Sequence, residues 1–293
     1  MPAGGRPTVR SRRLGAALRR YREAAKLDQQ HAADHIVGSK AKISRIEAGQ
    51  VSARPGDVRL LLELYGVEDH AVYQRLEQLA RDSNKRGWWL NFSWATREAG
   101  FADFITLETD ATFIRTWQPL FIPGLLQTDD YLRTLMSSDL TVHSAESVDE
   151  ALAMRAVRRS LIGKDGARFA AVIWEPALTA PMPSRKVHRE QLEHILNVAQ
   201  QQNVRVQVLP LSEWRAAHLS SHFVMLSFGP EPASEVVGYD TTTSTVLLED
   251  LEEMAGHARI FEALTAAALT PNQSLAFIRK TLRDIPESEK EEE

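Results

Sequence analysis

Apolar residues recur every three or four positions along residues 11–80, which is the spacing of amphipathic helices. The first stripe, Leu14, Leu18, Tyr21 and Ala25, predicts a helix that begins at Ser11. Shorter stripes predict four more helices, whose inward residues are Ala32, Ala33 and Ile36; Ile43 and Ile46; Val58, Leu61, Leu62 and Tyr65; and Ala71, Val72, Leu76 and Leu79. The pattern therefore predicts a compact domain of five short helices.

Only two residues, Val37 and Gly38, separate the second predicted helix from the third. Asp28 and Ser39 stand where a helix N-cap is expected, and Gly49 follows the third helix in the position that favours glycine. Two helices joined by a short turn that contains glycine are typical of a helix-turn-helix.

Beyond residue 100 the pattern becomes a mixture of helices and strands. Helices are predicted over 188–202 and 250–267 and after Thr270, and strands over Phe169–Trp174, Val204–Val208, Phe223–Phe228, Glu235–Tyr239 and Thr245–Leu248. The connections between the last three strands permit only antiparallel neighbours. We therefore expect an α+β protein, with an N-terminal five-helix helix-turn-helix domain and a C-terminal mixed domain whose largely antiparallel sheet is flanked by helices.

The composition excludes several classes of protein. The 293 residues include no Cys, so disulfides, thiolate zinc sites and thiol nucleophiles are excluded. The N-terminus lacks the apolar region of a secretory signal, and no stretch approaches the ~18 apolar residues of a membrane span. We expect a cytoplasmic protein that is not associated with a membrane. Its expected organisation is a disordered basic arm (1–10), a helix-turn-helix domain (11–80), a Trp-rich connector (81–100), an effector or partner-binding domain (101–286) and a disordered acidic tail (287–293).

Charge is distributed unevenly, because residues 1–54 carry a net +8 and the remainder carries −12. With Ile43 and Ile46 facing inward, the third helix turns Ala41, Ser44 and Arg45 outward, and Lys40 and Lys42 lie at the flanks. Arg or Lys can bind guanine in the major groove of DNA, and Ala can contact a thymine methyl group. Gln29 opens the second helix, whose N-terminal amides could hold a phosphate. The alternative is a helical bundle with a solvated cationic face.

Residues 14–67 resemble a lambda-repressor-like helix-turn-helix of the Xre type. The resemblance rests on Gln29 and on residues 39–49, S-K-A-K-I-S-R-I-E-A-G. It implies binding of double-stranded DNA by Gln29, Ser39, Lys40, Ala41, Lys42, Ser44 and Arg45, with Lys42 on the DNA backbone. It also implies a structural ion pair between Arg22 and Glu47.

The C-terminal domain offers no convincing catalytic or metal-binding pattern. His188 and His194 are six residues apart, which places them on different faces of a helix. His218 and His222 flank Ser220 and Ser221, but a nucleophilic serine also needs a base and an orienting carboxylate in space. We expect no catalytic residues, no metal site and no cofactor.

Residues 101–285 resemble the uncharacterised effector domain that follows Xre-type domains in antitoxin-like regulators of high-GC bacteria. The matching strings are L-E at 107–108, W-Q-P-L at 117–120, P-G-L-L-Q-T-D-D-Y at 123–131, R-A-V-R-R at 155–159, E-P-A-L at 175–178, Q-L at 191–192, N-V-R-V-Q-V-L-P at 203–210 and A-A-A-L-T at 266–270. The resemblance implies a regulator that is often encoded beside a small partner protein, and it implies no catalytic activity.

Tryptophans are unusually dense in the expected connector, which holds Trp88, Trp89 and Trp94. One interpretation is that these aromatic residues hold the two domains together. The other is that they form, with Trp117, a surface for a ligand or a protein partner.

Three functions are compatible with these features. The first is a sequence-specific transcriptional regulator whose C-terminal domain senses a small partner protein or a ligand. The second is an antitoxin-like module that mainly sequesters a small protein and binds DNA for autoregulation. The third, an enzyme tethered to DNA, lacks a recognisable catalytic constellation. A homodimer is expected in the first two cases, because one recognition helix reads too few base pairs.

Overall fold

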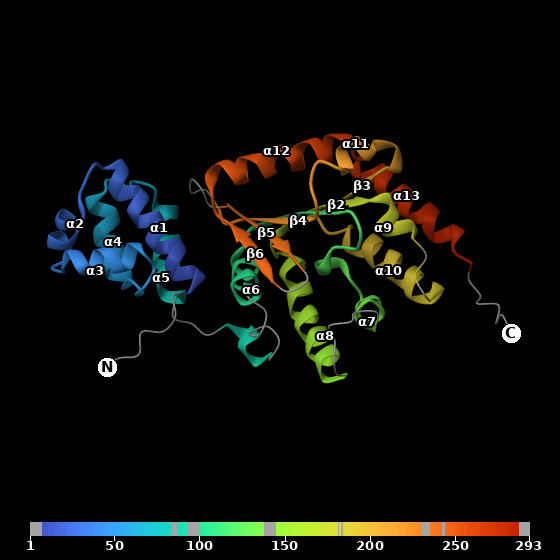
Figure 1. Ribbon diagram of the computed structural model, residues 1–293, viewed down its shortest axis with the longest axis horizontal. Coiled ribbons are helices and arrows are strands. Elements are labelled where there is room, and N and C mark those ends of the chain that lie inside the picture. The colour runs from blue at the N-terminus through green and yellow to red at the C-terminus, as the bar shows by residue number, and fades with distance from the viewer. Residues whose placement is uncertain are drawn as a thin grey trace. The chain divides into compact units, whose positions relative to one another are not determined.

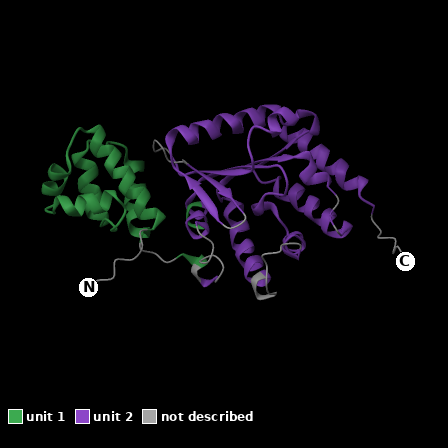
Figure 2. Ribbon diagram, viewed as in Figure 1, with its two compact units in different colours: residues 1–90, 105–107, 230–232 green, residues 91–104, 108–229, 233–293 purple. Residues whose placement is uncertain are grey.

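The computed structural model describes residues 8–83, 87–92, 100–137, 145–180, 182, 184–229, 235–241 and 244–286. The chain divides into two compact units (Figure 2): residues 1–90, with 105–107 and 230–232, form the first, and the remaining residues form the second. The expected acidic tail and Trp94 lie outside the described residues, as does the expected basic arm up to residue 7.

The first unit contains the five expected helices, α1 (Val9–Ala24), α2 (Gln29–His35), α3 (Lys40–Glu47), α4 (Pro55–Leu64) and α5 (His70–Asp82). Their inward faces share one core, in which Leu14, Leu18, Ile43, Ile46 and Leu62 are almost fully buried. The Asp28 and Ser39 side chains cap α2 and α3 as expected. The N-terminal helix-turn-helix domain expected from the hydrophobic pattern is therefore present.

Helix α1 begins two residues earlier than the sequence pattern predicted, so the expected disordered arm does not extend to residue 10. The Thr8 side chain caps the helix by accepting from the Ser11 amide, and its hydroxyl donates to the Ser83 carbonyl at 3.1 Å. Val9 and Arg10 are buried. The apolar stripe that starts at Leu14 gave no signal for this earlier turn, because contacts with the distant Ser83 fix it.

The second unit contains a six-stranded sheet with the order β3-β2-β1-β4-β5-β6 (Figure 1). The strands are β1 (Phe113–Gln118), β2 (Arg168–Trp174), β3 (Val204–Leu209), β4 (Phe223–Ser227), β5 (Glu235–Asp240) and β6 (Thr245–Leu248). The last three are antiparallel neighbours, as their short connections predicted. The α+β fold class is therefore confirmed, but the sheet is mixed, because β1 pairs with β2 and β2 with β3 in parallel.

Helices cover both faces of this sheet. The helices that follow residue 100 include α6 (Phe101–Asp110), α7 (Asp129–Ser137), α8 (Ala145–Arg159), α9 (Glu175–Thr179), α10 (Arg185–Val198), α11 (Trp214–Ala217), α12 (Leu251–Ala267) and α13 (Pro271–Asp284). In Figure 1, α12 crosses one face, and α8 and α10 lie on the other. Trp117 and Phe223 are fully buried in the core on the α12 side, with Phe261 of that helix packed against them. No helix among the described residues is both long and apolar enough to span a membrane.

Candidate DNA-binding surface

The predicted groove-facing residues share the exposed face of α3. Lys40, Ala41, Ser44 and Arg45 are exposed, whereas Ile43 and Ile46 are buried. Ser39 is also exposed, but its hydroxyl accepts from the Lys42 amide at 3.1 Å and caps the helix. This face combines small side chains, which permit close approach to DNA, with long cations that can reach base edges.

Two glycines allow α3 to lie close against α1. A Cβ atom on Gly15 would lie 2.2 Å from the Ile46 carbonyl oxygen, and one on Gly49 would lie 2.5 Å from the Arg12 Cα. Gly49 also has a φ of +68°, a left-handed conformation that glycine adopts without strain. The Ser11 hydroxyl donates to the Gly49 carbonyl at 2.8 Å. Close backbone approach therefore sets the position of the C-terminal end of α3.

The ion pair between Arg22 and Glu47, expected from the resemblance, is present and nearly buried. Arg22 Nε lies 2.6 Å from Glu47 Oε1, and Arg22 Nη2 lies 3.0 Å from Oε2. A third donor, Arg22 Nη1, bonds to the Leu27 carbonyl at 2.7 Å. The hydrogen bond with Glu47 raises the pKa of Arg22. The pair connects α1 to the end of α3 and to the residues before α2.

Gln29 is positioned by this same carboxylate, because its side-chain nitrogen donates to Glu47 Oε2 at 2.9 Å. An amide nitrogen carries two hydrogens, so one of them stays free for the DNA phosphate that the resemblance implies. Two of the backbone amides at the start of α2, which were expected to hold a phosphate, already have a partner within the fold. The Asp28 carboxylate already accepts from the Gln30 and His31 amides at 2.8 and 2.9 Å, and its charge would repel an incoming phosphate.

Lys42 is less available than the sequence indicated. Its ammonium group lies 2.7 Å from Asp57 Oδ2, and its side chain is 35% exposed. Asp57 is in the first turn of α4, fifteen positions along the chain, and no local sequence pattern connects the two residues. A phosphate contact by Lys42 must therefore compete with Asp57, which sequence reasoning missed.

Two of the three described tryptophans in the predicted surface set are buried. Trp117 is fully buried, and its indole donates to the Ser220 carbonyl at 3.1 Å, so the predicted surface role of Trp117 is wrong. Trp89 is also buried, with the Arg10 guanidinium 6.0 Å from its ring centroid. Trp88 packs edge-on against Trp89 and is partly exposed. Of the described members of the set, only Trp88 could contact a partner appreciably.

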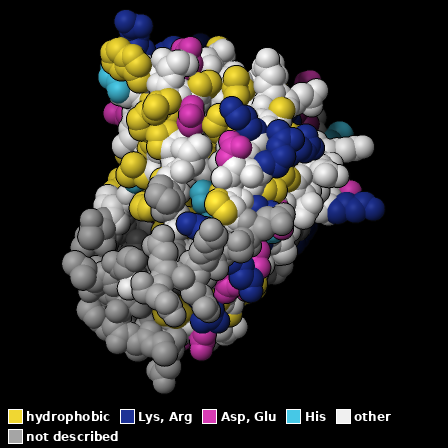
Figure 3. Space-filling model, turned by 90° about the vertical axis from the view of Figure 1, so that its right-hand side faces the viewer, with side chains coloured by type: hydrophobic (Ala, Val, Ile, Leu, Met, Phe, Trp, Pro, Cys, Tyr) yellow, Lys and Arg dark blue, Asp and Glu magenta, His cyan; other side chains and the backbone are white. Residues whose placement is uncertain are grey.

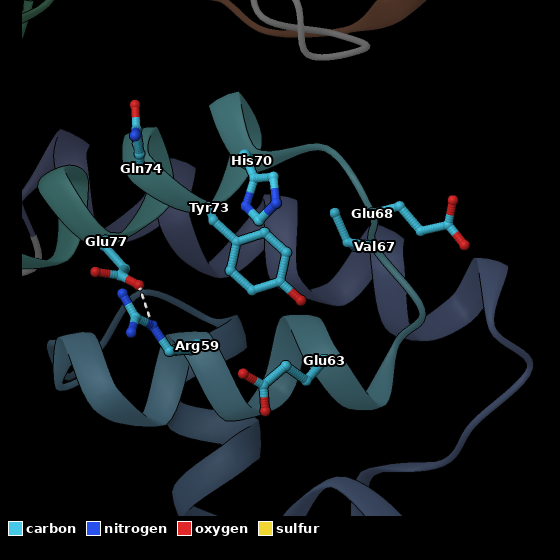
Figure 4. Close-up of a pocket in the computed structure, with 8 residues that line it drawn as sticks. All are labelled: Arg59, Glu63, Val67, Glu68, His70, Tyr73, Gln74 and Glu77. Carbon is cyan, nitrogen blue, oxygen red and sulfur yellow. Dashed lines mark hydrogen bonds and ion pairs between the residues drawn. The ribbon is translucent and has the colours of Figure 1, made fainter.

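A cleft of about 550 Å³ lies between α4 and α5 (Figure 4). Its lining residues are Arg59, Glu63, Val67, Glu68, His70, Tyr73, Gln74 and Glu77. Arg59 and Arg81 both bond to Glu77, and the hydrogen bond from Arg59 lowers the pKa of that carboxyl. With three glutamates in its wall, the cleft is unsuited to DNA phosphates.

The second unit brings several of the quoted strings together around residues 119–128. Arg158 forms a buried bidentate pair with Glu108, with N–O distances of 2.6 and 2.9 Å. Arg159 Nη1 donates to the Gln127 carbonyl at 2.9 Å. Gln191 donates to the Leu126 carbonyl and accepts from the Thr128 amide. Arg159 and Gln191, from two of these strings, therefore hold the loop, whereas the Arg158–Glu108 pair connects α8 to α6. Sequence order alone could not reveal these contacts.

One face of the molecule is drawn in Figure 3, and its described part carries Lys and Arg side chains beside Asp and Glu side chains. Hydrophobic side chains lie between them. Such a mixture does not indicate a further DNA-binding surface on this face, because DNA binding favours a field of one sign.

The comparisons with known proteins give two matches. A family model described as "Helix-turn-helix domain" matches residues 13–76, and one described as "Domain of unknown function (DUF5753)" matches residues 101–280. No curated protein and no solved structure matches the chain. The first match supports a DNA-binding regulator, and the second spans more than half of the chain.

Proposed function

The chain belongs to the family described as domain of unknown function (DUF5753), and we propose that it is a sequence-specific transcriptional regulator of the Xre type whose second unit senses a small partner protein or a ligand. The observation that carries the proposal is the exposed face of α3. Lys40, Ala41, Ser44 and Arg45 lie there together, on a helix fixed by the buried Arg22–Glu47 pair.

In the proposed complex, α3 occupies the major groove. The Arg45 guanidinium suits a guanine, because its planar donors can pair with O6 and N7 at once. Gln29, held by Glu47, contacts a backbone phosphate at the groove edge. The proposal gives the protein a binding function in the cytoplasm and no catalytic one.

A homodimer follows from the small footprint of one such helix. Two copies of α3 would read half-sites about 34 Å apart on one side of the duplex. Candidate dimer surfaces are the exposed side of α5 and the edge strand β6, where Val246 is 43% exposed.

The test is a gel shift of the full chain with its own promoter fragment, over a salt series and against random DNA. Arg45→Ala should relax specificity at one base position, whereas Arg133→Ala, a change in the second unit, should leave binding unchanged. The small protein encoded beside this one is then added. A shift that is specific, salt-sensitive and changed by this protein supports both parts of the proposal.

Other outcomes separate the alternatives. Specific binding that is indifferent to the neighbouring protein favours a small-molecule ligand. Binding no tighter than to random DNA contradicts the regulator, and capture of the small protein would then favour the antitoxin-like module.

A further inference from the structure

Arg155 of α8 is a half-buried arginine that the fold leaves without a bonded partner. Its guanidinium makes no hydrogen bond or ion pair with any residue of the described ranges, although its side chain has intermediate exposure. A guanidinium carries five N–H donors, and those of Arg155 are not used by the described fold but remain within reach of solvent or of a ligand. The neighbouring arginines on α8 differ, since Arg158 and Arg159 both bond to acids.

The acids around Arg155 already have partners of their own. Glu108 uses both carboxylate oxygens on Arg158, and Asp129 pairs with Arg159 at 2.7 Å. Asp240, at the end of β5, acts on Arg155 through its charge and accepts from the Thr245 hydroxyl at 3.1 Å. Arg158 and Arg159 add repulsion, and burial lowers the pKa of Arg155 to about 9. The guanidinium nevertheless stays charged near pH 7, and no acid among the described residues bonds to it.

The loop of residues 119–128 is shaped to admit this side chain. A Cβ atom on Gly124 would lie 2.0 Å from Arg155 Nη1, so the guanidinium occupies the space that glycine leaves open. Other contacts hold the loop in place. The Gln127 side chain donates to the Ile122 carbonyl at 2.7 Å, and the Gln191 side chain bonds to the Leu126 carbonyl and the Thr128 amide. The close approach explains the glycine in the P-G-L-L-Q-T string, and it places an arginine with free donors against a fixed backbone.

We propose that Arg155 and the Gly124 loop form a binding site for the oxyanion of a small ligand, either a carboxylate or a phosphate. Both groups present two oxygens that match two parallel N–H donors of a guanidinium. The bound anion would neutralise Arg155 and connect α8 to the loop. This inference rests on the proposed function, since it gives the chemical class of ligand that the second unit would sense.

The test measures binding of inorganic phosphate and of succinate to the full-length protein by titration calorimetry, with sodium chloride at matched ionic strength. The variants are Arg155→Met, which removes the guanidinium, and Gly124→Ala, which displaces it while keeping its charge. Arg133→Met serves as the control, because it removes an arginine from nearby α7 that is 52% exposed and pairs with Asp149. Melting of each ligand-free protein is recorded in parallel.

We expect saturable binding of at least one of the two anions, a loss of at least tenfold in affinity in Arg155→Met, a smaller loss in Gly124→Ala and none in Arg133→Met. Binding of phosphate alone indicates a phosphorylated ligand, and binding of succinate alone indicates a carboxylate. Ligand-free Arg155→Met should melt no lower than the wild type, because it loses an unpaired charge. If neither anion binds, if Arg155→Met retains full affinity, or if it melts several degrees lower without anion, the site is refuted.

A gel shift with and without the bound anion separates this inference from the proposed function. Specific DNA binding without anion binding would refute the site and leave the regulator intact. Anion binding that requires Arg155, in a protein that binds no specific DNA, would support the site and refute the regulator.

Discussion

Replacement of Glu47 by Ala is the most demanding test of how the helix-turn-helix is held together. The change removes two contacts with Arg22, at 2.6 and 3.0 Å, and one with Gln29 at 2.9 Å. Among the described residues, Arg22, which is 8% exposed, then keeps only its hydrogen bond to the Leu27 carbonyl and a 3.7 Å contact with the Glu23 carboxylate. Removal of one partner of a buried ion pair costs about 3–5 kcal/mol, because the other charge stays buried and uncompensated.

The matched control is Glu23→Ala, which breaks the exposed pair between Arg19 and Glu23 and removes from Arg22 only a 3.7 Å contact, leaving the buried pair with Glu47 intact. The side chains of Arg19 and Glu23 are 62% and 51% exposed, so solvent screens the pair and the loss of stability should be far smaller than in Glu47→Ala. The double variant Arg22→Met with Glu47→Leu should recover much of the stability lost in Glu47→Ala, because apolar groups can replace a buried pair at little cost.

The assay is urea unfolding of the full chain followed by circular dichroism, with hydrogen exchange to assign the transition to residues 8–83. Glu47→Ala should also weaken DNA binding, since Gln29 loses the group that orients it. If Glu47→Ala costs no more than Glu23→Ala, the buried pair does not hold the two helices, and the reasoning fails.

Three further predictions concern α3 and the turn before it. Arg45→Ala should cost about 1–3 kcal/mol of operator affinity and relax specificity at one base position, measured by gel shifts with operator variants; equal losses on every sequence would contradict base recognition. Asp57→Asn frees Lys42 from its 2.7 Å contact, so DNA binding should tighten on all sequences and its dependence on salt concentration should steepen by about 1 in slope. Lys42→Ala should have the opposite effect on both. An unchanged salt slope in both variants would exclude a phosphate contact by Lys42. Val37 has a φ of +51°, a left-handed conformation that asparagine tolerates better than valine, and its side chain is 96% exposed. Val37→Asn should therefore stabilise the first unit by about 1 kcal/mol in urea unfolding. A loss of stability would show that the valine side chain has a contact of its own.

The sequence predicted the first unit far better than the second because its contacts are local. Caps such as Asp28 and Ser39 and the stripe of Leu14 and Leu18 are all set by neighbours a few positions away. Strand β1 was missed, although it lies at the centre of the sheet. Thr116 and Trp117 are both buried in it, which breaks the alternation that identifies a strand. Its parallel pairing with β2 depends on residues more than fifty positions away.

The same distinction explains which site residues could be found. The exposed face of α3 follows from helix geometry once Ile43 and Ile46 face inward, so its members were predictable. Asp57 was not, because its contact with Lys42 is decided by the packing of α4. Trp117 was misassigned for the related reason that aromatic density in a sequence does not distinguish a surface from a core.

The sequence strings of the second unit show that tertiary packing can give different roles to residues of the same motif. Arg155, Arg158 and Arg159 stand within one short string, and the sequence gives no reason to separate them. Tertiary contacts assign Arg158 to Glu108 and Arg159 to Gln127 and Asp129, and they leave Arg155 against Gly124 with free donors. Two of these arginines therefore serve the fold, and the third carries charge that the fold does not use. An arginine without a fold partner costs stability in the absence of a ligand, so a binding role gives the most direct physical reason for its presence.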